Sequence, residues 1–128
     1  MTVRVRHQGP GVPGVSAMRE SETVAVRLPG EIDTTNADQV AEQLVAAAVQ
    51  DVAVIVADLT ATRFCASAGV RALLLARTKL AAGNAELRLA APEDGAVRRV
   101  LALVGPDQLL PVYPTAEAAL APGPRPRA

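Results

Sequence analysis

The sequence predicts an α/β fold with a mostly parallel sheet of four or five strands, an N-terminal β-hairpin and about four helices. Two observations carry this prediction. Apolar stretches with strand character alternate along the chain with stretches that have helical apolar spacing. Such alternation is typical of a parallel sheet whose strands are joined by right-handed helical crossovers. In addition, residues 52–57 form a nearly continuous apolar run, as expected for a strand buried on both faces.

The first two strands are predicted from alternation. Residues 2–7 alternate apolar and basic side chains, and residues 21–28 alternate again. In the second stretch Val24 and Val26 share one face while Thr23 and Ala25 share the other, which predicts a strand half exposed to water. The intervening residues 8–20 begin with a cluster of glycines and prolines, so we expect a hairpin with an enlarged, flexible loop.

Two helices are expected next, separated by the buried run. Thr35 is a candidate N-cap of the first helix, and Asp38 follows in its first turn, where a carboxylate is favoured. The second helix is predicted to begin at Ser67 and to run to Ala82, before Gly83 ends it.

The remaining elements continue the alternation of strands and helices. Residues 87–91 predict a strand, and Pro92 fits the first turn of a third helix. Residues 109–113 predict a last strand, and residues 115–120 a final helix with Thr115 as its cap. We assign residues 1–121 to one domain. Residues 122–128, rich in proline and arginine, are expected to form a disordered tail.

Composition excludes several classes of function. The 13 basic and 13 acidic residues balance, unlike the charge of a nucleic-acid-binding protein. Phe64 and Tyr113 are the only aromatic residues, so a platform for stacking bases is not expected. With His7 as the sole histidine, the sequence indicates neither a multi-histidine metal site nor a bound cofactor. Cys65 is the single cysteine, which fits a reducing cytoplasm, and no apolar run is long enough to predict a membrane span.

Two segments carry a family resemblance. Residues 26–33 read Val-Arg-Leu-Pro-Gly-Glu-Ile-Asp, and residues 58–70 read Asp-Leu-Thr-Ala-Thr-Arg-Phe-Cys-Ala-Ser-Ala-Gly-Val. Together they resemble the STAS domain of bacterial anti-sigma factor antagonists. That family has a Gly-Glu/Asp-Leu/Ile-Asp motif between a strand and a helix. It also has an Asp-Ser-x-Gly motif at the start of the following helix. The predicted order of elements matches a STAS-type fold from about residue 20 to residue 121.

The resemblance implies a function in signalling rather than catalysis. The serine of the Asp-Ser-x-Gly motif, which is Ser67 here, would be phosphorylated by an anti-sigma factor that is a serine kinase of the histidine-kinase-like ATPase fold. Unmodified, the antagonist binds this partner and releases a sigma factor, and a phosphatase reverses the modification. The chain departs from the family at two positions, with Ala66 in place of the aspartate and Ala68 after the serine.

The predicted partner surface combines both motifs, because both follow strands at the same end of a parallel sheet. A phosphate on Ser67 would lie at a helix N-terminus, where free amides favour negative charge, and would add roughly two negative charges. If Ser67 has only a structural role, its hydroxyl is expected to be the N-cap of the helix. The residues assigned to the surface are Glu31, Asp33, Thr34, Ala66, Ser67, Ala68, Gly69 and Arg71.

The neighbouring residues have structural interpretations. Asp58 is expected to form an Asx turn, and Phe64 to fill the core beneath the loop. Cys65 is expected to be a small buried hydrophobe, and Gly69 to permit close packing at the helix start.

Two other functions stay open at this stage. One is a non-phosphorylated STAS scaffold, or a subunit of another signalling or lipid-transport complex. The other is a small enzyme on a parallel sheet.

Overall fold

The computed structural model describes residues 2–6, 22–49, 51–104 and 110–121. Five strands form one sheet in the order β1-β2-β4-β6-β7, with β1 antiparallel to β2 and all other neighbours parallel. This confirms the predicted fold class and the pairing of the first two strands. The strands are β1 (Thr2–Arg6), β2 (Glu22–Arg27), β4 (Val52–Asp58), β6 (Glu86–Ala90) and β7 (Val112–Tyr113). His7, the loop at residues 8–20 and the tail at residues 122–128 lie outside the described residues.

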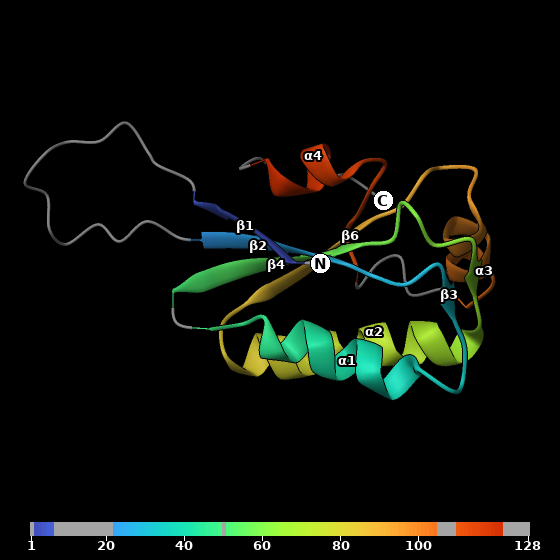
Figure 1. The fold of residues 1–128 in the computed structure, drawn as a ribbon, viewed down its shortest axis with the longest axis horizontal. Coiled ribbons are helices and arrows are strands. Elements are labelled where there is room, and N and C mark those ends of the chain that lie inside the picture. Colours follow the sequence, from blue (N-terminus) through green and yellow to red (C-terminus); the bar gives the residue numbers. More distant parts are fainter. Residues whose placement is uncertain (1, 7–21, 50, 105–109, 122–128) are drawn as a thin grey trace, which may run out of the picture.

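The helices cover both faces of the sheet. Figure 1 shows α1 and α2 side by side on one face, α4 on the other, and α3 beyond the carboxyl ends of the strands. Two short strands, β3 and β5, form a separate sheet near α3. The helices are α1 (Ala37–Ala46), α2 (Ser67–Ala82), α3 (Ala96–Val104) and α4 (Ala116–Leu120), and the short strands are β3 (Glu31–Ile32) and β5 (Phe64–Cys65).

The main core lies between the sheet and the pair α1 and α2. Alternate residues of the strands point into it, as the period of a strand requires, and meet the apolar stripes of the helices. Between the two helices the contact is made by small side chains, Ala37, Ala41 and Ala72, which lets the helices pack closely. The largest side chains with no exposed surface include Ile32, Leu44, Ile55, Leu59, Leu73, Leu89 and Leu110.

Strand β2 is buried on both faces, so the prediction that one face meets water is wrong. Thr23 and Ala25 are only 3% and 5% exposed. Ala25 lies in a second apolar cluster with Val56 and with Ala119 of α4. The alternation of small and large residues in β2 therefore reflects two different apolar contacts.

Helix α4 is held on the sheet by polar contacts. The buried Arg88 donates through Nη1 to the carbonyls of Ala119 (3.1 Å) and Ala121 (3.2 Å), and through Nε to Glu86 Oε1 (3.0 Å). At the other end, Thr115 Oγ1 accepts a bond from Ala118 N (3.1 Å), so the predicted N-cap is confirmed. Both ends of this short helix are thus fixed.

Two other helix starts differ from the prediction. Helix α1 begins after Asn36 rather than Thr35, and no side chain caps it. Thr35 lies one residue before the observed N-cap, and its hydroxyl donates to Asp33 instead. Pro92 lies in a turn closed by a bond from Gly95 N to Pro92 O (3.1 Å), so α3 begins at Ala96 rather than at the proline.

Candidate functional site

The two sequence motifs are joined by the small sheet. Strand β3 pairs in parallel with β5, with Glu31 opposite Phe64 and Ile32 opposite Cys65. The connection continues on both sides, because Arg63 N donates to Gly30 O (2.7 Å) and Ala66 N donates to Ile32 O (2.8 Å). The segment after β2 and the segment before α2 therefore form one structural unit at the carboxyl ends of the parallel strands.

The register of this small sheet decides which side chains face solvent. Ile32 and Cys65 are buried, so their neighbours Glu31 and Phe64 point outward, as strand alternation requires. Phe64 is 52% exposed, and the prediction that it fills the core is wrong. Cys65 is 2% exposed, which confirms it as a buried hydrophobe, and burial raises the pKa of its thiol. The thiol is therefore protonated at neutral pH.

Gly69 permits the close packing that the sequence predicted. A Cβ atom at this position would lie 2.7 Å from Cys65 Sγ and 2.8 Å from Ile32 Cγ2. These are the two inward side chains of the small sheet, so the missing side chain lets β3 and β5 rest directly on α2. Gly69 is itself buried, so it supports the surface from below.

Ser67 is the first residue of α2 and not its N-cap, so the N-cap interpretation is wrong. The cap position belongs to Ala66, whose backbone is extended, with φ −77° and ψ 165°. The Ser67 side chain is exposed. Within the described part of the chain its hydroxyl makes no hydrogen bond. The hydroxyl is therefore accessible to a partner or to a modifying enzyme.

Asp33 carries a fixed negative charge beside this helix start. Its Oδ1 accepts bonds from Thr35 Oγ1 (2.5 Å) and Thr35 N (2.9 Å). The bond from the Thr35 hydroxyl is the main cause that lowers the pKa of Asp33, and the bond from the Thr35 amide adds to it. Asn36 completes the loop, since its Oδ1 accepts from Asp33 N (2.9 Å) and its Nδ2 donates to Glu31 O (2.8 Å). The loop is therefore held by its own polar side chains.

Asp58 supports the site from within. Its Oδ1 accepts bonds from Thr60 N (3.0 Å) and Thr60 Oγ1 (2.6 Å), which confirms the predicted Asx turn. Nearby, Thr62 Oγ1 donates to Pro29 O (2.8 Å), 33 residues away in sequence. The Asp58 bonds fix the turn after β4, and the Thr62 bond ties this loop to the loop after β2.

The structure thus places most of the predicted surface on one joined unit. Glu31, Thr34 and Ser67 are exposed, while Asp33, Ala66 and Ala68 are half-buried. Arg71 is exposed one helical turn beyond Ser67. Sequence reasoning missed the outward position of Phe64. The signal was the pair Cys65 and Gly69, because a small apolar residue packed against a glycine faces inward and strand alternation then turns Phe64 outward.

Across the segments described above, no group of three or more His, Cys, Asp or Glu residues is placed to hold a metal ion. None of the described helices is long and apolar enough to cross a membrane.

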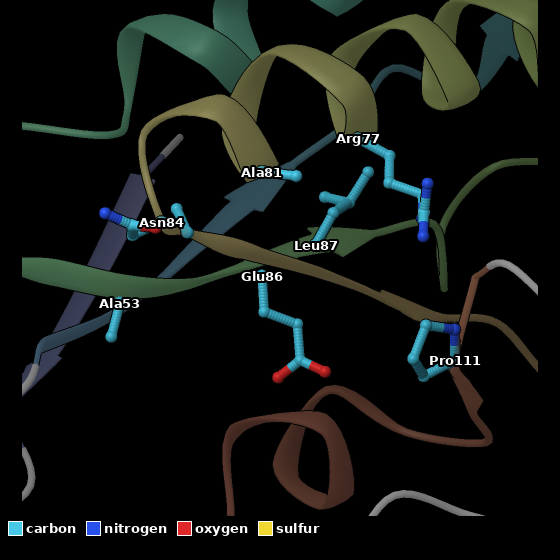
Figure 2. A pocket seen from close by; sticks show the side chains of 8 residues that line it. Ala53, Arg77, Ala81, Asn84, Glu86, Leu87 and Pro111 are labelled. Atoms are coloured by element: carbon cyan, nitrogen blue, oxygen red, sulfur yellow. The ribbon is translucent and has the colours of Figure 1, made fainter.

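A separate hollow of about 260 Å³ lies at the amino ends of β4 and β6. Its polar lining includes Arg77, Asn84 and Glu86. Figure 2 shows Arg77 and Leu87 on the α2 side of β6, with Glu86 on the side that faces α4. None of the predicted site residues lines this hollow, so it does not belong to the site.

Comparisons with known proteins agree with this arrangement. The family model described as STAS domain matches residues 15–119. An anti-sigma factor antagonist from Mycobacterium paratuberculosis is 27% identical, with 94% of this chain and 92% of that chain covered at a TM-score of 0.62. The anti-sigma factor antagonist SpoIIAA in its unphosphorylated form is 28% identical, with coverages of 75% and 84% and a TM-score of 0.60. A comparison with curated proteins gave no significant match.

Proposed function

The chain belongs to the STAS domain family, and from this premise we propose that it is an anti-sigma factor antagonist. It binds an anti-sigma factor that is also a serine kinase, and thereby releases a sigma factor. The observation that carries the proposal is the pairing of β3 with β5. This pairing joins the segment of Asp33 to the segment of Ser67, so one partner surface can contact both motifs.

Phosphorylation of Ser67 is the proposed switch. The exposed hydroxyl is accessible to a kinase, and no hydrogen bond within the described residues has to break before it reacts. A phosphate would add roughly two negative charges to a unit that already carries the ionised Asp33. A partner surface that fits a small neutral hydroxyl would then meet a bulky anion and dissociate.

The partner follows from the same proposal. We assign it to the serine kinases of the histidine-kinase-like ATPase fold, with a phosphatase that restores the unmodified form. In this proposal the protein acts in the cytoplasm, binds no cofactor and catalyses no reaction. The two structural neighbours known as anti-sigma factor antagonists support the general role.

The experiment measures binding and modification together. Purified protein is titrated by calorimetry with each kinase of this class encoded by the host, and then incubated with the binding kinase and ATP. We expect one phosphate on Ser67 by peptide mapping, intact binding by Ser67→Ala, and loss of binding by Ser67→Asp. Gln43 is exposed in the second half of α1 and serves as the matched control, because Gln43→Glu adds the same charge away from both motifs.

A second function is favoured by one departure from the family. Ala66 stands where the family has an aspartate, so the carboxylate beside the serine is missing. This favours a non-phosphorylated STAS scaffold, or a subunit of another signalling or lipid-transport complex. Binding that is unaffected by Ser67→Asp, with no phosphate on Ser67 in protein purified from its own host, would support this second function and refute the switch.

A further inference from the structure

We infer that Arg71 binds the phosphate on Ser67, so that one modification changes two exposed residues of α2 at once. The inference rests on the proposed function and deepens its switch. It concerns a residue that follows the second family motif and does not belong to it.

Ser67 and Arg71 lie on the same exposed side of α2. They are separated by one helical turn, a spacing at which Cβ atoms are about 5–6 Å apart. Both are exposed, whereas Gly69, Val70 and Ala72 are buried. The side chains of a helix tilt toward its N-terminus, so the long side chain of Arg71 is directed back over Ser67. A phosphate on Ser67 is therefore within reach of the Arg71 guanidinium.

Arg71 has no partner among the described residues. Within these ranges its guanidinium makes no hydrogen bond and no ion pair. The first turn of α2 holds no acidic residue, and Ala66 stands where the family has an aspartate. The carboxylate that could have neutralised Arg71 from this turn is absent, so the positive charge is available to a phosphate.

The order of the two charges along the helix also favours the pair. An acidic group that lies one turn before a basic group stabilises a helix more than the reverse order, in agreement with the helix dipole. A phosphate carries roughly two negative charges, and a planar guanidinium can donate two parallel hydrogen bonds to its oxygens. A lysine would offer only a point charge. The pair therefore suits an arginine in particular.

Other charges surround the start of α2 and would also act on the phosphate. Ala66 N donates to Ile32 O (2.8 Å). Ser67 and Asp33 are the next residues of the two segments, so they lie at the same end of the small sheet. The ionised Asp33 would repel the phosphate, and Arg71 opposes this repulsion. Further charged residues on the adjoining segments are Glu31, Asp38 and Arg63. The effect of Arg71 is therefore measured between variants that keep all of these charges.

Phosphorylation would then change the proposed partner surface in two ways. It replaces the neutral Ser67 hydroxyl by an anion, and it withdraws the Arg71 guanidinium from the partner. Release of the partner therefore does not depend on repulsion by the phosphate alone.

The test places phosphoserine at position 67 during protein synthesis, through an expanded genetic code, so that no kinase is needed. Phosphorus NMR then follows the second pKa of the phosphate, which is ordinarily about 6. Because Arg71 favours the doubly charged form, Arg71→Gln should raise this pKa by about 0.3, as expected for one pair at this spacing. Arg71→Lys should raise it less, and the difference should shrink in about 1 M salt. In wild type the Arg71 Nε–H resonance should titrate with the same pKa as the phosphate.

The matched control is Lys79→Gln, which removes the same charge from another exposed position of α2. Lys79 lies roughly 18 Å along the helix from Ser67, farther than the screening length of about 8 Å at physiological salt. The phosphate pKa of this variant should stay within about 0.1 of wild type. Since Arg71 and Lys79 are exposed, both variants should fold as wild type does, which thermal unfolding checks.

The outcomes separate this inference from the function on which it rests. Equal phosphate pKa values in wild type and Arg71→Gln, or an equal rise in Lys79→Gln, would refute the pair. The proposed function would stand in that case, because binding of the kinase and modification of Ser67 are measured without Arg71 variants. If no host kinase modifies Ser67, the switch is refuted, whereas a raised pKa in Arg71→Gln alone still supports the pair.

Discussion

Replacement of Gly69 by alanine tests the packing beneath the proposed surface. The new Cβ would lie 2.7 Å from Cys65 Sγ and 2.8 Å from Ile32 Cγ2, closer than Cβ atoms pack in proteins. Neither side chain can swing away, because one is short and the other is β-branched and fully buried. The small sheet would therefore have to move off α2.

The magnitude follows from two opposing terms. Overpacking of a core costs about 1–3 kcal/mol, and the contact with two buried side chains places Gly69→Ala toward the upper end. Alanine favours a helix over glycine by up to about 1 kcal/mol. We expect a net destabilisation of about 1–2 kcal/mol, which lowers Tm by about 3–8 °C for a chain of this size. Partner binding should fall as well, because β3 and β5 carry the proposed surface.

Urea and thermal unfolding measure this effect, with Gly83→Ala as the matched control. A Cβ at Gly83 meets only the Leu80 carbonyl, at 3.6 Å, so that variant should stay within about 0.5 kcal/mol of wild type. Adding Cys65→Ala removes one of the two clashes, so the double variant should lose less than the sum of the single losses. A Gly69→Ala protein as stable as wild type would refute the close contact.

Three further predictions follow from the hydrogen bonds. Thr35→Val removes the main cause of the lowered Asp33 pKa, so NMR titration from about pH 2 to 6 should find that pKa higher, nearer its ordinary value. A carboxylate whose pKa is lowered by folding stabilises the fold at pH values above its unfolded pKa, and this stabilisation is lost as the pH falls through its folded pKa. The free energy of unfolding of Thr35→Val should therefore depend less on pH in that acidic range. Arg88→Met leaves the carbonyls of Ala119 and Ala121 without their donor and should lower the free energy of unfolding in urea by about 2–4 kcal/mol. A loss below about 1 kcal/mol would show that Arg88 does not hold α4 on the sheet. Thr115→Ala should cost about 1 kcal/mol because Thr115 caps a helix, whereas Ser67→Ala should cost less than about 0.5 kcal/mol because Ser67 does not; equal losses would contradict the assigned N-caps.

The sequence predicted the order of the main elements because each has its own periodicity. Strand β4 and helix α2 were placed within a residue of their observed bounds, since an apolar run and a helical stripe are local signals. Strands β3 and β5 have two residues each, too few for any period to appear. Their pairing depends on contacts between segments about 30 residues apart, which periodicity does not report.

The errors at single residues share one physical cause. Ala25 was predicted to face water, but Ala119 of α4, more than 90 residues later, packs in the same apolar cluster and covers it. Phe64 was predicted to be buried because of its type, whereas register on the small sheet turned it outward. Thr35 was predicted as a cap, but α1 begins one residue later, after Asn36, and the Thr35 hydroxyl bonds to Asp33. In each case a tertiary contact or a competing bond overrode a local preference.

The pairing of β3 with β5 also affects the thermodynamics of recognition. Fixing the backbone of one free residue costs about 1–2 kcal/mol of conformational entropy, and loops that become ordered only on binding lose that amount from their affinity. Here the two segments are already held by backbone bonds and by the side chains of Asn36, Thr60 and Thr62. The conformational entropy of these segments is therefore lost on folding and not on binding, so a partner binds a rigid, preorganised surface. Association through such a surface should show a small entropic penalty, and its rate should not be limited by loop rearrangement.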